Sequence, residues 1–473
     1  MSYIFFTPST LKGKMTKNIL FLFLLTFLIG CKKEDDAKPV VITPATGEPK
    51  EFAAPFTGVP NLKDMVFYEV NMRAYSQAGD FKGVQARLDD IKALGINVIW
   101  LMPIHPVGQL KSVGELGSPY AVRNYTEVNP EFGTLADLQN LVKEAHDRQM
   151  AVVIDWVANH TAWDNPWITD HPDWYTRDAN GNIQIPAGTN WQDVAELNYN
   201  HPDMRKAMIK AMKYWVFRAN IDGFRCDAAD FMPFDFWKQA IDTLRNVSNR
   251  KIILLAEGSR SDHFSAGFQL NYGWNFYTMI KNVFRTGVSA NNLAATHKAA
   301  YNALPANTGL LRFTTNHDES AWDGSPVQLL GGKKGAFSAF VITAYMGGVP
   351  LLYGGQEVGR AETTPFFSKS PIDWTANSDY FTAYKQVMAF RQSSTTVRQG
   401  ELENFPHNDA VVFKKKLLSE EVLVIANPRN GTVNYTVAPV LENTTWKNAL
   451  TQADYSLGTT LTLQPYDYLI LKK

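Results

Sequence analysis

The feature that most constrains the fold of this chain is a regular alternation of short apolar runs with longer segments of helical periodicity, between residues 65 and 393. Short apolar runs are typical of buried strands, and apolar residues spaced by three and four predict amphipathic helices. Strands are predicted at 65–70, 97–102, 151–155, 222–226, 252–256, 268–272, 310–315 and 349–353. Helices are predicted at 84–94, 135–145, 203–219, 234–246, 291–301, 332–346 and 379–393. This alternation favours a parallel sheet over a sandwich.

Eight strands of this kind predict a (β/α)8 barrel of the α/β class over residues 59–395. One stretch inside it breaks the alternation. Residues 160–200, after the third strand, are rich in Trp, Asn, Asp, Gly and Pro, and so long a connection indicates an inserted lid subdomain. From 396 to 473 short alternating runs replace the helical pattern, which predicts a C-terminal antiparallel β domain.

The N-terminal segment has the pattern of an export signal. Three lysines, Lys12, Lys14 and Lys17, precede an apolar run over 19–29, which is well short of the ~20 residues that a membrane-spanning helix needs. The sequence LIGC at 28–31 resembles a bacterial lipoprotein processing site, in which Cys31 becomes the lipidated first residue. The alternative is an ordinary secretory signal over 1–30 with an incidental cysteine.

Residues 31–58 contain several prolines and show no periodicity, so we expect an extended tether there. With Cys31 acylated, the protein is expected in the cell envelope as an outer-membrane lipoprotein that faces either the periplasm or the outside. Nothing in the sequence identifies a protein partner.

The charge is balanced, with 46 basic and 46 acidic side chains. No basic stretch interleaved with aromatic residues is present, which argues against a nucleic-acid partner. The two cysteines, Cys31 and Cys226, are not expected to meet, so no disulfide framework is predicted.

Three carboxylates stand where predicted strands end. Asp227, Glu257 and Asp318 each close a different apolar run, and in a β/α barrel the carboxyl ends of the strands carry the reacting groups. His160 and His317 lie at neighbouring strand ends. Because unpaired carboxylates are costly beside apolar runs, three together indicate chemistry rather than structural ion pairs.

The sequence also suggests how two of these acids differ. Arg225 lies two residues before Asp227, so the two side chains share a face of the strand and the cation should keep Asp227 ionised. Glu257 has no cation beside it in the sequence, so we expect it to be the protonated partner. An ionised carboxylate and a protonated one, about 5–5.5 Å apart, are the pair that a retaining glycosidase uses.

Four segments, in this order, resemble the signature regions of the α-amylase family of glycoside hydrolases. They are DWVANH at 155–160, GFRCD at 223–227, AE at 256–257 and FTTNHD at 313–318. The resemblance extends from about residue 65 to 393, and it implies a barrel with a lid after the third strand and a C-terminal β domain.

The resemblance also implies roles for single residues. Asp227 is the expected nucleophile, Glu257 the general acid and base, and Asp318 the carboxylate that fixes and distorts the sugar. Residues expected to bind substrate in the same subsite are Tyr120, His160, Arg225 and His317. Among these, Tyr120 matches the family's stacking tyrosine.

The sequence departs from the family at several positions. Asp230 and Phe231 stand where many α-amylases have a Lys-His pair that serves the acceptor sugar, which leaves the product pattern open. Asn159 matches a family calcium ligand, but Glu196 replaces the usual aspartate. No cofactor is expected for the chemistry, and the resemblance leaves a structural calcium ion and its ligands open.

Together these features predict a retaining, endo-acting α-amylase that hydrolyses α-1,4-glucosidic bonds in starch-like glucans or maltooligosaccharides. The barrel motifs do not separate it from a cyclomaltodextrinase, neopullulanase or transglycosylase of the same family. A catalytically inactive glucan-binding protein is a further alternative, although all three carboxylates are present. A metal-dependent barrel hydrolase is disfavoured because the sequence has no His-x-His pair.

Overall fold

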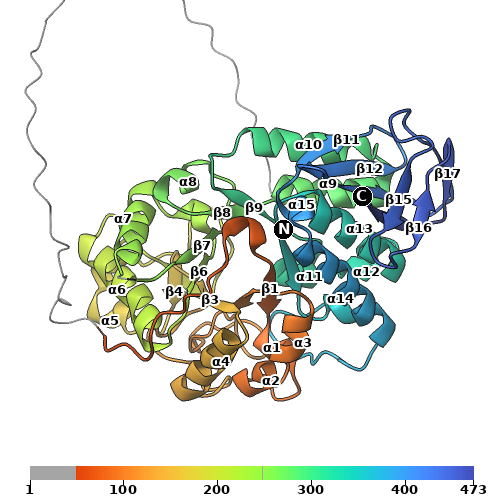
Figure 1. Cartoon of the computed structure of the whole chain (residues 1–473). Helices are drawn as coiled ribbons and strands as arrows, with labels where there is room; N and C mark the ends of the chain where they lie inside the picture. The colour runs from red at the N-terminus through yellow and green to blue at the C-terminus, as the bar shows by residue number, and fades with distance from the viewer. Residues whose placement is uncertain (1–48, 248) are drawn as a thin grey trace, which may run out of the picture. The chain divides into compact units, whose positions relative to one another are not determined.

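The computed structural model describes residues 49–247 and 249–473. A closed barrel of eight parallel strands forms its centre, in the order β1-β10-β9-β8-β7-β6-β3-β2 (Figure 1). The barrel strands are β1 (Phe67–Val70), β2 (Val98–Leu101), β3 (Ala151–Trp156), β6 (Gly223–Cys226), β7 (Ile253–Ala256), β8 (Leu270–Tyr272), β9 (Gly309–Arg312) and β10 (Val349–Tyr353). The predicted barrel is confirmed, and each predicted strand overlaps an observed one.

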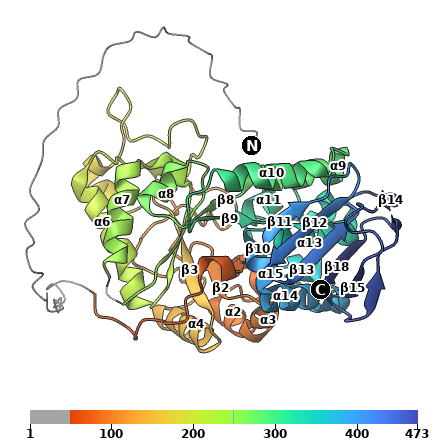
Figure 2. The same ribbon diagram turned by 45° about the horizontal axis from the view of Figure 1, so that its top comes forward.

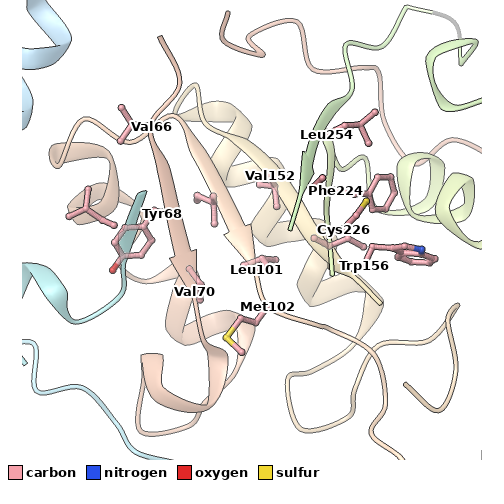
Figure 3. Close-up of a cluster of buried hydrophobic side chains, with 14 of the residues drawn as sticks. Val66, Tyr68, Val70, Leu101, Met102, Val152, Trp156, Phe224, Cys226 and Leu254 are labelled. Atoms are coloured by element: carbon pink, nitrogen blue, oxygen red, sulfur yellow. The ribbon is translucent and has the colours of Figure 1, made fainter. Parts of the chain in front are cut away.

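The barrel strands are buried on both faces, which is why they appear in the sequence as continuous apolar runs. In β2, Val98 and Trp100 belong to the cluster inside the barrel, whereas Ile99 and Leu101 belong to the cluster between strands and helices. Figure 3 shows part of this outer cluster.

The outer layer consists of helices that follow the strands. They are α1 (Met72–Tyr75), α2 (Phe81–Gln85), α3 (Leu88–Ala93), α4 (Leu135–Asp147), α6 (Pro202–Arg218), α7 (Phe234–Arg245), α8 (Asp262–Ala266), α9 (Trp274–Thr286), α10 (Asn291–Asn302), α11 (His317–Trp322), α12 (Pro326–Leu329), α13 (Gly332–Met346), α14 (Ser378–Ser393) and α15 (Thr395–Gln399). Four single 3-10 turns are η1 (Leu62–Asp64), η2 (Pro172–Trp174), η3 (Ala229–Phe231) and η4 (Gln356–Val358).

The short helices α1, α8, α11, α12 and α15 were not predicted, and the helical layer differs from the prediction in two further places. The helix expected at 84–94 is divided into α2 and α3, because Arg87 leaves the helical conformation between them. The sequence pattern did not predict α9, which contains several aromatic, Asn and Thr residues of modest helix propensity. This helix buries Phe276, Ile280 and Val283 at helical spacing, so its packing against the barrel compensates for the weak propensity.

The inserted segment after β3 contains little regular structure. Its strands β4 (His160–Ala162) and β5 (Val194–Glu196) pair antiparallel, and α5 (Trp167–Asp170) lies between them in the chain. The short hairpin fastens both ends of the insertion beside β3, which carries the first of the four sequence motifs.

The C-terminal part forms the predicted antiparallel β structure. A six-stranded sheet has the order β11-β12-β13-β18-β15-β16, and β14 pairs with β17 (Figure 2). The strands are β11 (Glu401–Asn404), β12 (Val411–Leu417), β13 (Glu420–Ala426), β14 (Val433–Thr436), β15 (Thr445–Asn448), β16 (Asp454–Ser456), β17 (Thr460–Leu463) and β18 (Tyr468–Lys472). The two sheets enclose a separate apolar core.

The described end of the predicted tether is attached to the barrel. The backbone N–H of Phe52 donates to the carbonyl of Phe217 (2.8 Å), and the ring of Phe56 stacks on His146 with 4.2 Å between centroids. The chain is therefore a strap against α4 and α6 here, rather than a free linker. The predicted signal peptide and the rest of the tether, up to residue 48, lie outside the described residues. Within the described ranges, no helix is long and apolar enough to cross a membrane.

Candidate active site

The barrel brings the three predicted carboxylates to the carboxyl ends of its strands. Asp227 directly follows β6 and Glu257 directly follows β7, and the two strands pair in register up to Cys226 and Ala256. One further hydrogen bond, from the N–H of Glu257 to the carbonyl of Cys226 (2.9 Å), extends the pairing. Asp227 and Glu257 therefore leave adjacent strands at the same level. Asp318 lies in the first turn of α11, beyond β9.

Arg225 lies at the centre of this site and is fully buried. Its Nη1 contacts Oδ1 of Asp155 (2.8 Å) and Oδ1 of Asp227 (2.9 Å), and its Nη2 forms an ion pair with Oε2 of Glu257 (2.9 Å). Its Nε donates to the Tyr272 hydroxyl (3.0 Å). The expectation that Glu257 has no cationic partner is wrong, because closure of the barrel brings Arg225 to it.

The Arg225 guanidinium is shared by three acids, so it does not stabilise the ionised form of Asp227 alone, as the sequence led us to expect. Burial raises the pKa of the Asp227 carboxyl well above its ordinary value; Arg225 opposes this shift, and the Glu257 and Asp155 carboxylates add to it. Burial likewise raises the pKa of Asp318. Asp227 and Asp318 therefore hold protons more tightly than isolated carboxylates would.

Backbone groups of the turn after β6 fix the position of Glu257. Its Oε2 accepts a hydrogen bond from the N–H of Ala228 (2.8 Å), and its carbonyl accepts one from the N–H of Ala229 (2.8 Å). Ala228 adopts the left-handed conformation, with φ 44°, which a residue with a side chain rarely adopts. The strained turn thus aims its N–H groups at Glu257.

A second buried network surrounds His317. Its Nδ1 lies 2.5 Å from Oε1 of Glu69, and its Nε2 lies 2.6 Å from the Tyr120 hydroxyl and 3.3 Å from Oδ2 of Asp318. Burial alone would lower the pKa of His317, but the carboxylates of Asp318 and Glu69 raise it to about 9. His317 is therefore an imidazolium at neutral pH, and it adds a second positive charge to the site.

The structure brings Tyr120 into the same network but buries most of it. Its hydroxyl donates to Oδ2 of Asp155 (2.9 Å), and its ring stacks beside His317 at 5.4 Å. Tyr120 is 8% exposed, so only an edge of the ring remains for a sugar. His160 is buried against the Tyr120 backbone, and burial lowers its pKa to about 4, so the imidazole is neutral.

Sequence reasoning assigned no role to two residues of the site, Glu69 and Asp155. Both are fully buried in barrel strands; Glu69 binds His317, and Asp155 binds Arg225 and Tyr120. Their position could have indicated a role, because each is a charged residue inside an apolar strand and such a group is buried only with a partner.

Aromatic side chains form two groups near the site residues. In the first group, Trp322 is 62% exposed, and its ring lies 5.8 Å from that of Phe366, which in turn lies 5.6 Å from Tyr120. In the second group, Trp191 of the insertion lies 5.4 Å from His160 and 6.0 Å from Phe231. Exposed ring faces suit the apolar faces of pyranose rings.

At the family's calcium position, both carboxylate oxygens of Glu196 already accept hydrogen bonds from the insertion. Oε2 of Glu196 accepts a hydrogen bond from the Thr176 hydroxyl (2.5 Å), and Oε1 accepts one from the N–H of Ala187 (3.2 Å). Both carboxylate oxygens therefore close the insertion on itself. Within 49–247 and 249–473, no group of three or more His, Cys, Asp or Glu side chains is arranged to hold a metal ion.

Comparisons with known proteins agree with this geometry. The family described as "Alpha amylase, catalytic domain" matches residues 66–399. An alpha-amylase of Haloarcula japonica is 25% identical over 389 residues, which cover 79% of this chain and 56% of that protein. This chain thus spans little more than half of that relative's length.

Two solved structures are similar over most of this chain. A crystal structure of an alpha-amylase from Lactobacillus plantarum has a TM-score of 0.78 at 28% identity, and the match covers 87% of this chain and 99% of that one. A noncanonic maltogenic alpha-amylase from Thermotoga neapolitana has a TM-score of 0.78 at 29% identity, with the same two coverages of 87% and 99%.

Proposed function

Since the chain belongs to the alpha-amylase family and is a glycoside hydrolase, we propose that it hydrolyses α-1,4-glucosidic bonds inside starch-like glucans and maltooligosaccharides with retention of configuration. The observation that carries this proposal is the single guanidinium of Arg225 between two carboxylates on adjacent strands, Asp227 and Glu257. A retaining glycosidase requires two such acids on either side of one bond.

In the first step, the ionised form of Asp227, which Arg225 favours against the effect of burial, attacks the anomeric carbon. Arg225 holds Oδ1 of Asp227, so Oδ2 forms the ester bond. The glycosidic C–O bond breaks, and the leaving oxygen takes its electron pair together with the proton of Glu257. Oε2 of Glu257 is held by Ala228 and Arg225, so Oε1 is the atom that carries this proton.

In the second step, Glu257 acts as a base. It takes a proton from water, the water oxygen bonds to the anomeric carbon, and the ester to Asp227 breaks. The two inversions give net retention. Asp318, 34% exposed at its side chain, is the acid most open to solvent and would accept hydrogen bonds from sugar hydroxyls.

The aromatic residues support binding in the middle of a chain. Trp322 packs on Phe366 and Trp191 packs on Phe231, and the proposal assigns one of these aromatic pairs to each side of the scissile bond. Sugars on both sides of the scissile bond would then have a ring to stack on, which favours endo-type cleavage.

The test is product analysis on amylose, pullulan and cyclodextrins, with wild type beside Glu257→Gln. We expect wild type to release short α-maltooligosaccharides from amylose, with the α-anomer first by NMR, and the variant to lose about 100-fold or more in rate. Cyclodextrin cleavage or transfer to added sugar would instead indicate a cyclomaltodextrinase or a transglycosylase. A wild type that binds amylose without cleaving it would contradict the proposal and favour a glucan-binding protein.

We further propose that Cys31 anchors the enzyme in the cell envelope as a lipoprotein. The sequence LIGC at 28–31 supports this proposal. In a producing cell, wild type is expected in the membrane fraction and Cys31→Ser in the soluble fraction. An unchanged distribution would refute the anchor without touching the enzymatic proposal.

A further inference from the structure

We propose that Asp230 is a positioning residue that holds the general acid and base, Glu257, at its working position. The inference rests on the proposed function, since it concerns the same site. Asp230 stands where many family members have the first residue of a Lys-His pair, and it belongs to η3 after β6. Its carboxylate binds the loop that follows Glu257.

The contacts of this carboxylate are numerous. The N–H of Ser259 donates to Oδ1 (3.2 Å) and Oδ2 (3.0 Å), the Ser259 hydroxyl donates to Oδ2 (3.2 Å), and the N–H of Arg260 donates to Oδ1 (3.2 Å). An ionised carboxylate that accepts several N–H and O–H groups makes stronger hydrogen bonds than neutral pairs do. Asp230 thus fixes two consecutive residues of the loop.

The loop after Glu257 also donates hydrogen bonds back to the segment that contains Asp230. Nη1 of Arg260 donates to the carbonyls of Asp230 (2.9 Å) and Met232 (2.9 Å). The same guanidinium is oriented by Asp262, whose oxygens lie 3.0 Å and 2.5 Å from it. The loops after β6 and β7 are therefore joined by hydrogen bonds in both directions.

Close packing adds a steric constraint. A Cβ at Gly258 would lie 2.5 Å from Oδ1 of Asp230 and 2.5 Å from Cε1 of His263. The backbone directly after Glu257 thus packs closely against Asp230, and a larger residue at Gly258 would have to displace the side chain of Asp230 or His263.

These contacts act on Glu257 from both directions along the chain. The N–H groups of Ala228 and Ala229 bind the carboxylate and the carbonyl of Glu257 itself. Asp230 binds Ser259 and Arg260, which follow Glu257 in the chain. Because a displacement of about 1 Å at a reacting group can cost 10²-fold in rate, removing the contacts of Asp230 should weaken proton transfer from Glu257 to the leaving oxygen.

The experiment compares two substrates that differ in their need for a proton. The sugar leaving group of a maltooligosaccharide would be a poor alkoxide unless the acid protonates it, whereas α-maltosyl fluoride loses fluoride, which needs little protonation. For Asp230→Ala we expect kcat/KM on the oligosaccharide to fall about 100-fold and kcat/KM on the fluoride to stay within about threefold. Glu257→Gln should show the same asymmetry and serves as the reference.

The matched control is Asp235→Ala on α7, since Asp235 is paired with Arg205 at 2.7 Å and its side chain is 65% exposed. It should leave both rates unchanged. Equal losses on both substrates for Asp230→Ala, or no loss on either, would overturn the inference.

If Asp230→Ala does not fold, Asp230→Asn provides the same comparison, because its amide oxygen can still accept from Ser259 and Arg260. It should show an intermediate asymmetry, and an Asn variant with no asymmetry would likewise overturn the role. A wild type inactive on both substrates would refute the proposed function itself, which is a separable result.

Discussion

At the scale of single residues, Arg225 is the group on which the site depends most. It contacts Asp155, Asp227 and Glu257 and is itself inaccessible to solvent. Burying one cation among acids is tolerable only because each acid offsets part of the desolvation cost of the guanidinium. The same contacts leave Oδ2 of Asp227 and Oε1 of Glu257 free for chemistry.

Replacing Arg225 with Leu should lower the free energy of unfolding by about 3–5 kcal/mol at neutral pH, because the buried carboxylates lose their counter-charge. The loss should be smaller at a pH of about 5, where those carboxyls, whose pKa values burial raises, take up protons. Urea unfolding at the two pH values measures both. Lys143→Ala, which removes an exposed pair with Asp147, should change the stability little. A loss that does not depend on pH would contradict the electrostatic cause.

His317 should make the stability of the protein depend on pH. Its pKa is raised from 6.5 to about 9 in the folded chain, so the stability it contributes is complete below pH 6.5 and is lost as the pH rises through about 9. The contribution is on the order of 3 kcal/mol. Unfolding of wild type and His317→Asn, compared at pH values of about 6 and about 10, should show a wild-type advantage that shrinks at the higher pH. Parallel curves would show that the Glu69 and Asp318 contacts do not set this pKa.

At the scale of elements, α11 links the acids to the exposed aromatic surface. The helix begins with His317 and Asp318, and it ends at Trp322. Its Ncap residue, Asn316, accepts a hydrogen bond from the N–H of Glu319, which fixes the start of the helix and therefore the direction of both ends. The short helix thus holds Asp318 and Trp322 at a set separation.

Trp322→Ala should raise KM for maltoheptaose by about five- to tenfold, because one exposed ring contact of about 1 kcal/mol is lost. The kcat/KM for a short aryl maltoside should change little, since it does not reach that ring. Leu418→Ala, at another exposed apolar residue (88% exposed) in the C-terminal sheet, is the control and should change neither value. A similar loss on both substrates would place Trp322 in the fold rather than in substrate binding.

Elements also show where sequence patterns were sufficient. The barrel strands were predictable because burial on both faces makes each strand a short apolar run, and these runs alternate with helical patterns along the chain. The helix α9 was missed because its residues have modest intrinsic propensity, and only packing of Phe276, Ile280 and Val283 stabilises it. The break between α2 and α3 had no comparable signal in the sequence.

At the scale of the whole molecule, hydrogen bonds of Glu196 close the insertion after β3 on itself. Both carboxylate oxygens of Glu196 accept hydrogen bonds, one from the hydroxyl of Thr176 and one from the N–H of Ala187. We therefore expect the Tm of wild type to be the same in EDTA as in excess calcium, measured by thermal unfolding. A lower Tm in EDTA, restored by calcium, would show that a calcium ion binds elsewhere on the chain.

The sequence by itself determined the alternation of strands and helices, and with it which residues stand at the ends of strands. It also paired Arg225 with Asp227, because residues two apart on a strand necessarily share a face. These are local relations, and a strand or helix expresses them wherever it lies in space.

Only the tertiary structure decided which of those residues form ion pairs and hydrogen bonds with one another. His317 and Glu69 are 248 positions apart in the chain. Arg225 lies on β6, and Glu257, with which it pairs, follows the adjacent strand β7. Closure of the barrel brings such groups together, and the low polarity of its interior then makes each contact strong enough to shift a pKa or to orient an acid. No local pattern encodes which distant partner a buried charge will meet.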